Sequence, residues 1–177
     1  MPKKYTVDKD FHNTRFDKWF KFSVKILPQS LVEKIINSVD AVLIKECLNF
    51  GINPESSEAP SSIQDAQKLF FNIFNGKLSS IDTKQRSRIA ENIYLVASGS
   101  KFPSLDIVDL GEGQSPSAFK DTFLSLNKGN KSKMQFVQGK FGMGGTGVLS
   151  FGSPKHNLQL IISKRNQTIK DSDEEWG

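Results

Sequence analysis

The sequence has very few of the residues that build metal centres and disulfides. Cys47 is the only cysteine, and His12 and His156 are the only histidines. A single cysteine excludes an internal disulfide and a cysteine-rich zinc cluster. So few imidazoles also argue against a transition-metal centre or a Ser-His-Asp hydrolase site. Magnesium and phosphate chemistry stays open, because it uses oxygen ligands and backbone amides.

Long apolar runs are also missing from the chain. No stretch approaches the roughly 20 apolar residues that a membrane-spanning helix needs, and residues 1–5 lack the apolar run of a signal peptide. We therefore expect a cytoplasmic protein without a membrane partner. The 177 residues, of which 37% are hydrophobic and 14 are phenylalanine, suit one domain over 1–177 with a packed core.

Residues 1–27 interleave aromatic and basic side chains, as in the stretch from Phe16 to Phe22. Such interleaving suits stacking on a nucleic-acid strand and neutralising it. It also suits an edge strand or arm whose aromatic side chains pack inward while its lysines face water. We favour the arm, because a net charge of +5 is only a mild basic excess and does not establish a nucleic-acid partner.

Apolar spacing in the rest of the chain predicts an α+β fold. Runs at helical spacing predict three helices, at 28–50, 63–74 and 116–126. Runs of β-favouring residues predict four strands, at 89–97, 105–108, 148–151 and 158–163. This order indicates a two-layer sandwich, with helices on one face of a mostly antiparallel sheet.

A polar stripe follows the first predicted helix. Glu33, Asn37 and Asp40 lie within an arc of roughly 60° on an ideal helix, away from its apolar side. A carboxylate can accept a proton from an attacking water, and an amide oxygen can hold a hard cation such as magnesium. Taken alone, the stripe is more typical of the solvated face of an ordinary amphipathic helix.

A second candidate segment follows the strand predicted at 105–108. Its sequence is Asp109-Leu110-Gly111-Glu112-Gly113. Two glycines let the backbone turn sharply and approach a ligand closely, and a carboxylate can accept a hydrogen bond from an exocyclic amine such as that of adenine. The alternative is an ordinary Asp-Gly turn that joins two elements.

A third candidate segment runs from Gly139 to Gly147, where five of the chain's 13 glycines fall within nine residues. Ordering so many glycines is entropically costly, and the exposed amides of such a loop can cradle phosphate oxygens with Lys131, Lys133 or Lys140 nearby. A flexible linker is the alternative, but linkers favour Gly and Ser without the Phe141 and Met143 found here.

Two common nucleotide motifs do not account for this loop. The chain contains no G-x-x-x-x-G-K-[ST] sequence, which excludes a Walker-type phosphate loop. Residues 142–147 match G-x-G-x-x-G, the dinucleotide fingerprint. That fingerprint should follow a strand and open a helix, whereas a β-favouring run follows it here.

The three segments together resemble the GHKL ATPase superfamily, which includes gyrase-type topoisomerases, ninety-kilodalton heat-shock chaperones, histidine kinases and MutL-type repair proteins. The helix motif E-x-x-x-N-x-x-D-A is matched by Glu33, Asn37, Asp40 and Ala41. The adenine-site motif D-x-G-x-G is matched by Asp109, Gly111 and Gly113. The lid-hinge motif G-x-x-G-x-G is matched by Gly139, Gly142 and Gly144. The resemblance implies the Bergerat fold and spans roughly residues 28–163.

The resemblance also implies a role for each matched position. Glu33 would orient or deprotonate the hydrolytic water, Asn37 would bind a magnesium ion that bridges the phosphates, and Asp109 would receive the adenine amino group. Gly111 and Gly113 would shape the base pocket. The implied ATP site is completed by Asp40, Ala41, Lys131, Gly139, Lys140, Phe141, Gly142, Met143 and Gly144. Residues 114–138 would contain the ATP lid.

Two departures from the family pattern shape the expected function. The motifs at Ala41 and Asp109 are farther apart than in compact members, so residues 51–88 are interpreted as an insertion. A late strand with an adenine-site threonine is not found before Gly177, so we expect a fragment that lacks its final strand. The expected activity is slow, magnesium-dependent ATP hydrolysis, with ATP-dependent homodimerisation through domains that follow. The alternatives are an ATP-gated interaction domain without hydrolysis and a basic nucleic-acid-binding module.

Overall fold

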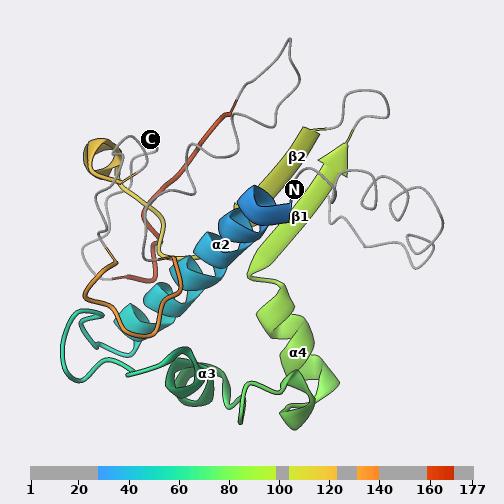
Figure 1. The fold of residues 1–177 in the computed structure, drawn as a ribbon, viewed down its shortest axis with the longest axis vertical. Coiled ribbons are helices and arrows are strands. Elements are labelled where there is room, and N and C mark those ends of the chain that lie inside the picture. Colours follow the sequence, from blue (N-terminus) through green and yellow to red (C-terminus); the bar gives the residue numbers. More distant parts are fainter. Residues whose placement is uncertain (1–27, 99–103, 123–130, 140–158, 170–177) are drawn as a thin grey trace.

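A computed structural model describes residues 28–98, 104–122, 131–139 and 159–169 of the chain (Figure 1). Its helices are α2 (Pro28–Asn49), α3 (Ile63–Phe71) and α4 (Thr83–Ala90), with short 3-10 helices η2 (Leu78–Ser80) and η3 (Pro116–Lys120). Its strands are β1 (Ile93–Ser98) and β2 (Ser104–Asp109), which pair antiparallel. Helices combined with an antiparallel strand pair confirm the mixed α+β class.

The helix α2 runs through the centre of the described part, with the β1–β2 hairpin beside it and α3 and α4 at one end (Figure 1). Its bounds agree with the helix predicted over 28–50, and Pro28 suits a first helical position because its missing N–H needs no partner there. No helix within the described ranges is long and apolar enough to cross a membrane. The helix α2 has one polar face and one apolar face along its length.

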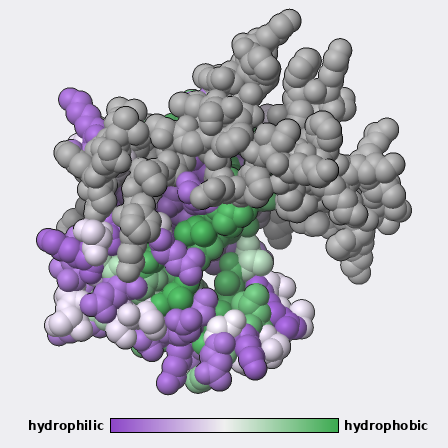
Figure 2. Space-filling model, in the orientation of Figure 1, coloured by the Kyte–Doolittle hydropathy of each residue, from purple (hydrophilic) through white to green (hydrophobic). Residues whose placement is uncertain are grey.

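The core forms where α2, α3 and residues 136–137 meet. Its fully buried members are Leu43, Ile44, Cys47, Ala66, Phe136 and Val137. Ala66 lies in α3. Residues 51–88, which were interpreted from the sequence as an insertion, therefore supply part of the core. The Cys47 thiol donates to the Ile52 carbonyl at 3.5 Å, and burial raises its pKa. Figure 2 shows apolar residues in the middle of one face, with hydrophilic residues around its lower part.

The helix α3 ends earlier than predicted. Its N-terminus is capped by Ser62, whose hydroxyl oxygen accepts the Asp65 N–H at 3.1 Å. Asp65 in turn accepts hydrogen bonds from the Ser61 and Ser62 hydroxyls, which lower its pKa. Asn72 then adopts the left-handed conformation at φ 55° and closes the helix. The predicted end at residue 74 was wrong, because Asn72 takes the terminating role usually given to glycine.

The helix α4 was not predicted, and the strand assigned to residues 89–97 began too early. Asp82 caps α4 by accepting the Gln85 N–H at 2.7 Å. At the other end, the Asn92 side chain donates to the carbonyls of Arg88 and Ile89 at 3.3 and 3.1 Å. Ile89 therefore belongs to the end of a helix, and β1 begins only at Ile93.

The strands predicted at 89–97 and 105–108 correspond to β1 and β2, which form an antiparallel hairpin. In its register Ile93 lies opposite Asp109, and Ser98 lies opposite Ser104. Along β2, the half-buried residues Leu105, Ile107 and Asp109 alternate with exposed ones, as expected for a strand with one covered face. Because α2 packs against β2, the alternation places Asp109 on the covered side of the hairpin.

Two later predictions need correction. The helix predicted over 116–126 is a 3-10 helix that ends at Lys120, and the Thr122 hydroxyl donates back to the Ala118 carbonyl at 2.9 Å. Residues 159–163 form no strand, although one was predicted over 158–163. Lys164, which follows them, is assigned to an isolated β-bridge. The strand predicted over 148–151 lies outside the described residues.

Candidate functional site

The polar stripe of α2 is graded in burial along the helix. Glu33 and Asn37 are half-buried, whereas Asp40 is fully buried. Burial lowers the pKa of the neighbouring Lys34, and attraction to Glu33 offsets part of that effect. The surroundings of Glu33 are therefore partly desolvated, an environment in which charged groups interact more strongly than in water.

Gly139 lies directly against the polar stripe of α2. The Gly139 N–H donates to Asp40 Oδ2 at 2.8 Å, and the Gln138 N–H donates to Asp40 Oδ1 at 3.0 Å. A Cβ at position 139 would overlap the Asn37 amide oxygen. Glycine is therefore required here because the backbone approaches α2 closely, while the predicted contact of this loop with phosphate stays a prediction.

Asp40 anchors the segment 131–139 to α2. Besides the two amides, its carboxylate accepts an ion-paired hydrogen bond from Lys131 Nζ at 3.3 Å. Phe136 and Val137 fix the same segment by burying their side chains in the core. Asp40 therefore has protein donors on both oxygens and organises the site, while its direct contact with a nucleotide stays a prediction.

The turn after β2 packs on the same helix. The Glu112 N–H donates to the Ala41 carbonyl at 3.0 Å, and a Cβ on Gly111 would overlap the Ala41 side chain. The Gly111 N–H donates to Asp109 Oδ1 at 3.0 Å and so orients that half-buried carboxylate. The structure thus brings the helix, the acidic turn and Gly139 together.

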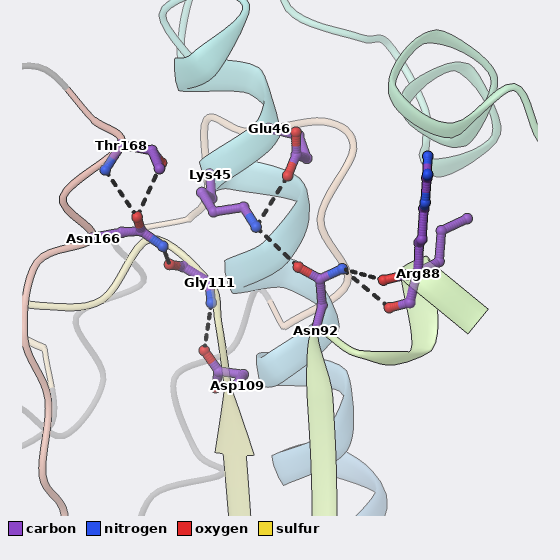
Figure 3. Close-up of polar contacts among 9 residues, drawn as sticks. Lys45, Glu46, Arg88, Asn92, Asp109, Gly111, Asn166 and Thr168 are labelled. Carbon is purple, nitrogen blue, oxygen red and sulfur yellow. Dashed lines mark hydrogen bonds and ion pairs between the residues drawn. The ribbon is translucent and has the colours of Figure 1, made fainter. Parts of the chain in front are cut away.

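A fourth segment, residues 163–168, completes this arrangement and was missed from the sequence. Gly113 has φ 63°, and a Cβ there would overlap the carbonyl of Lys164. The Asn166 N–H donates to the Glu112 carbonyl at 2.9 Å, and the Asn166 side-chain amide donates to the Gly111 carbonyl at 2.9 Å (Figure 3). No local motif marks these residues in the sequence.

A second network holds the hairpin on α2 from the other side (Figure 3). The Lys45 ammonium is largely buried; it donates to Asn92 Oδ1 at 2.9 Å and pairs with Glu46 at 3.0 Å. Asn92 immediately precedes β1, and its carbonyl accepts the Leu110 N–H at 2.8 Å. The two residues that follow Asp109 are therefore each fixed by one network, Leu110 through Asn92 and Gly111 through Asn166.

An ion pair covers the turn. Arg165 Nη1 lies 3.0 Å from Glu112 Oε2 and 3.2 Å from the Gly113 carbonyl oxygen. Burial raises the pKa of the Glu112 carboxyl, and the attraction of Arg165 and Lys131 offsets only part of this rise. Burial therefore destabilises the charged form of Glu112 by more than its interactions with Arg165 and Lys131 stabilise it.

This raised pKa gives a pH dependence with a defined sign. The Glu112 carboxyl keeps its proton to a higher pH in the folded chain than in the unfolded chain. The contribution of Glu112 to the free energy of unfolding therefore falls as pH rises from the ordinary pKa of a glutamate through the raised pKa of the folded state. In Glu112→Gln this dependence is removed. We expect wild type to gain stability relative to the variant as pH falls from neutral through that interval, measured by urea unfolding. A difference that is constant over this interval would contradict the assignment.

Other predicted site residues lie outside the described part of the chain. These are Lys140, Phe141, Gly142, Met143 and Gly144. Over the described residues, no group of three or more His, Cys, Asp or Glu side chains could hold a metal ion.

A shallow depression lies away from the candidate site. It measures about 390 Å³ and lies on α3 and the residues after it, lined by Asp65, Lys68, Leu69, Asn72 and Phe74. None of these residues belongs to the three predicted segments. The candidate site itself is defined by convergent polar groups and glycine backbones.

Comparison with known proteins adds no family assignment. No protein-family model, curated protein or solved structure matches the chain. The functional argument therefore depends on the residues of the site and on their arrangement around α2.

Proposed function

We propose that this chain binds ATP with magnesium in a Bergerat-type site of the GHKL kind. The observation that supports the proposal is convergence: the turn 109–113 and Gly139, from separate parts of the chain, both lie against the same face of α2. Gly139 contacts Asn37 and Asp40, and Gly111 contacts Ala41 one turn farther along the helix. Two close backbone approaches beside a polar stripe are what a site for a flat base and its phosphates requires.

The base end of the proposed site is at Asp109. Its Oδ1 accepts the Gly111 N–H at 3.0 Å, and a carboxylate has further acceptor positions for the amino group of adenine. The glycines at 111 and 113 carry no side chains, so the turn packs closely against Ala41 and Lys164 and holds Asp109 at the end of β2. Asp109 is only half-buried, which leaves it accessible to a ligand.

The phosphate end is at the first turns of α2 and the segment 131–139. Bound magnesium would supply positive charge to the phosphate oxygens, with Asn37 contributing an amide oxygen. Lys131 is partly exposed, with 23% of its side chain accessible, and its ammonium can also reach a phosphate. Glu33 would orient or deprotonate the attacking water, which makes the domain a slow ATPase.

The adenine assignment is tested with Asp109→Asn. An amide at this position turns part of an acceptor into a donor that opposes the adenine amino group, and a hydrogen bond to a charged acceptor is worth about 1.5–3 kcal/mol. We expect ATP affinity to fall at least tenfold in titration calorimetry with ATP and magnesium.

The matched control is Asp106→Asn, which changes an exposed carboxylate on the same strand and should leave ATP affinity unchanged. Unchanged affinity in Asp109→Asn would remove the adenine assignment. If wild type binds no ATP but binds DNA or RNA with a steep salt dependence, the nucleic-acid-binding module replaces the proposal.

A further inference from the structure

The segment 163–168 bonds to the residues that follow Asp109 and Leu110 in the turn. One backbone hydrogen bond joins Asn166 to Glu112, and the Ser163 hydroxyl accepts the Gln114 N–H at 2.9 Å. Arg165 reaches the Gly113 carbonyl from the same segment. A glycine-rich turn is flexible on its own, so the shape of this turn depends on its hydrogen bonds with the segment 163–168.

The Asn166 side chain has only one orientation compatible with its partners. The Thr168 backbone N–H, which can only donate, points to Asn166 Oδ1 at 3.0 Å, and the Thr168 hydroxyl donates to the same oxygen at 2.9 Å. The oxygen is thereby identified, and the amide nitrogen must face the Gly111 carbonyl at 2.9 Å. Figure 3 shows this order from Thr168 through Asn166 to Gly111.

Gly111 connects this network to the carboxylate. Its carbonyl accepts from Asn166, while its N–H donates to Asp109 Oδ1 at 3.0 Å. A rotation of the Gly111 backbone would break both bonds at once. The direction of the Asp109 carboxylate is therefore coupled to Asn166 through a single residue that has no side chain.

We infer that Asn166, held by Thr168, is a positioning residue for Asp109 and sets how well the site distinguishes adenine from other bases. The inference rests on the proposed ATP site, and it goes beyond it by assigning base selectivity to residues outside the three motifs. The phosphate end is held separately, because the Asp40 contacts fix 131–139 to α2 without involving 163–168.

The test compares ATP with inosine triphosphate, which has the same ribose and phosphates but an oxygen in place of the adenine amino group. Both affinities are measured with magnesium for wild type and Asn166→Ala. We expect wild type to prefer ATP. In Asn166→Ala the ratio of the two affinities should fall about fivefold, the effect of one hydrogen bond of about 1 kcal/mol, with inosine triphosphate affinity changed by less than about twofold.

Three further variants separate positioning from general stability. Thr168→Val removes the hydroxyl and should lower the ratio by a smaller factor, while Thr168→Ser keeps the hydroxyl and should restore the wild-type ratio. Gln167→Ala changes an exposed neighbour and should have no effect. Circular dichroism establishes that each variant is folded.

The outcomes also separate this inference from the proposed function. If wild type binds neither nucleotide, the proposed function fails. If wild type binds ATP but Asn166→Ala leaves the ratio unchanged, or lowers both affinities equally, Asn166 has only a structural role and the inference is overturned. A wild type that binds both nucleotides equally would likewise overturn it, because no base selectivity would exist to be set.

Discussion

Glu33→Ala is expected to lower ATP turnover by about 10²–10⁴-fold, the usual contribution of a general base, while ATP affinity changes by less than about twofold. Glu33 lies on α2 one turn before Asn37, at the phosphate end of the proposed site. It has no role in holding the base, which is assigned to Asp109 on the turn after β2. Hydrolysis and binding should therefore separate in this variant.

The measurement is single-turnover hydrolysis with enzyme in excess over ATP, together with a binding titration. Glu33→Gln keeps the shape and polarity of the side chain but not its basicity, so it should be as inactive as the alanine variant. Glu58→Ala removes an exposed glutamate in the loop before α3 and serves as the matched control. Equal turnover in wild type and Glu33→Ala would sink the catalytic role of Glu33.

Asp40→Ala is expected to reduce the free energy of unfolding by about 3 kcal/mol. The carboxylate is fully buried and accepts hydrogen bonds from Lys131, Gln138 and Gly139. Removing it leaves two backbone N–H groups and an ammonium without their acceptor. Because Lys131 can still turn toward water, the amides account for most of the expected loss.

Urea unfolding measures this loss, and Asp40→Asn serves as a variant of intermediate effect. The asparagine keeps one oxygen for an amide but loses the charge and the second acceptor, so its free energy of unfolding should lie between those of wild type and Asp40→Ala. Asp106→Asn, on the exposed face of β2, should change stability by less than about 0.5 kcal/mol. If Asp40→Ala were as stable as wild type, Asp40 would not anchor the segment 131–139.

Local sequence signals predicted the elements that form from local rules. The spacing of apolar residues gave α2 with nearly correct ends, and two β-favouring runs gave the hairpin. The errors arose where a short polar side chain decides the structure. Asp82 caps the start of α4, the Asn92 side chain bonds to the carbonyls at its end, and Asn72 ends α3. The predictions were based on glycines and apolar runs and gave these three residues no role.

The candidate site was predicted in part. The motif residues Asn37, Asp40, Ala41, Gly111 and Gly139 do meet, and motif order in the sequence was enough to associate them. The burial of Phe136 and Val137 was missed, because the residues before the glycine loop were interpreted as part of a lid. Tertiary packing decides that burial, since these side chains meet α2 and α3 across a long separation in sequence.

The contacts of the segment 163–168 have a consequence for how the protein folds. Its bonds to the turn join residues that are 49 to 55 positions apart, so a long loop must close before they form. Contacts of this kind form late and slow folding, whereas a helix and a short hairpin can form early. The base end of the site should therefore be among the last regions to gain protection from amide hydrogen exchange during refolding.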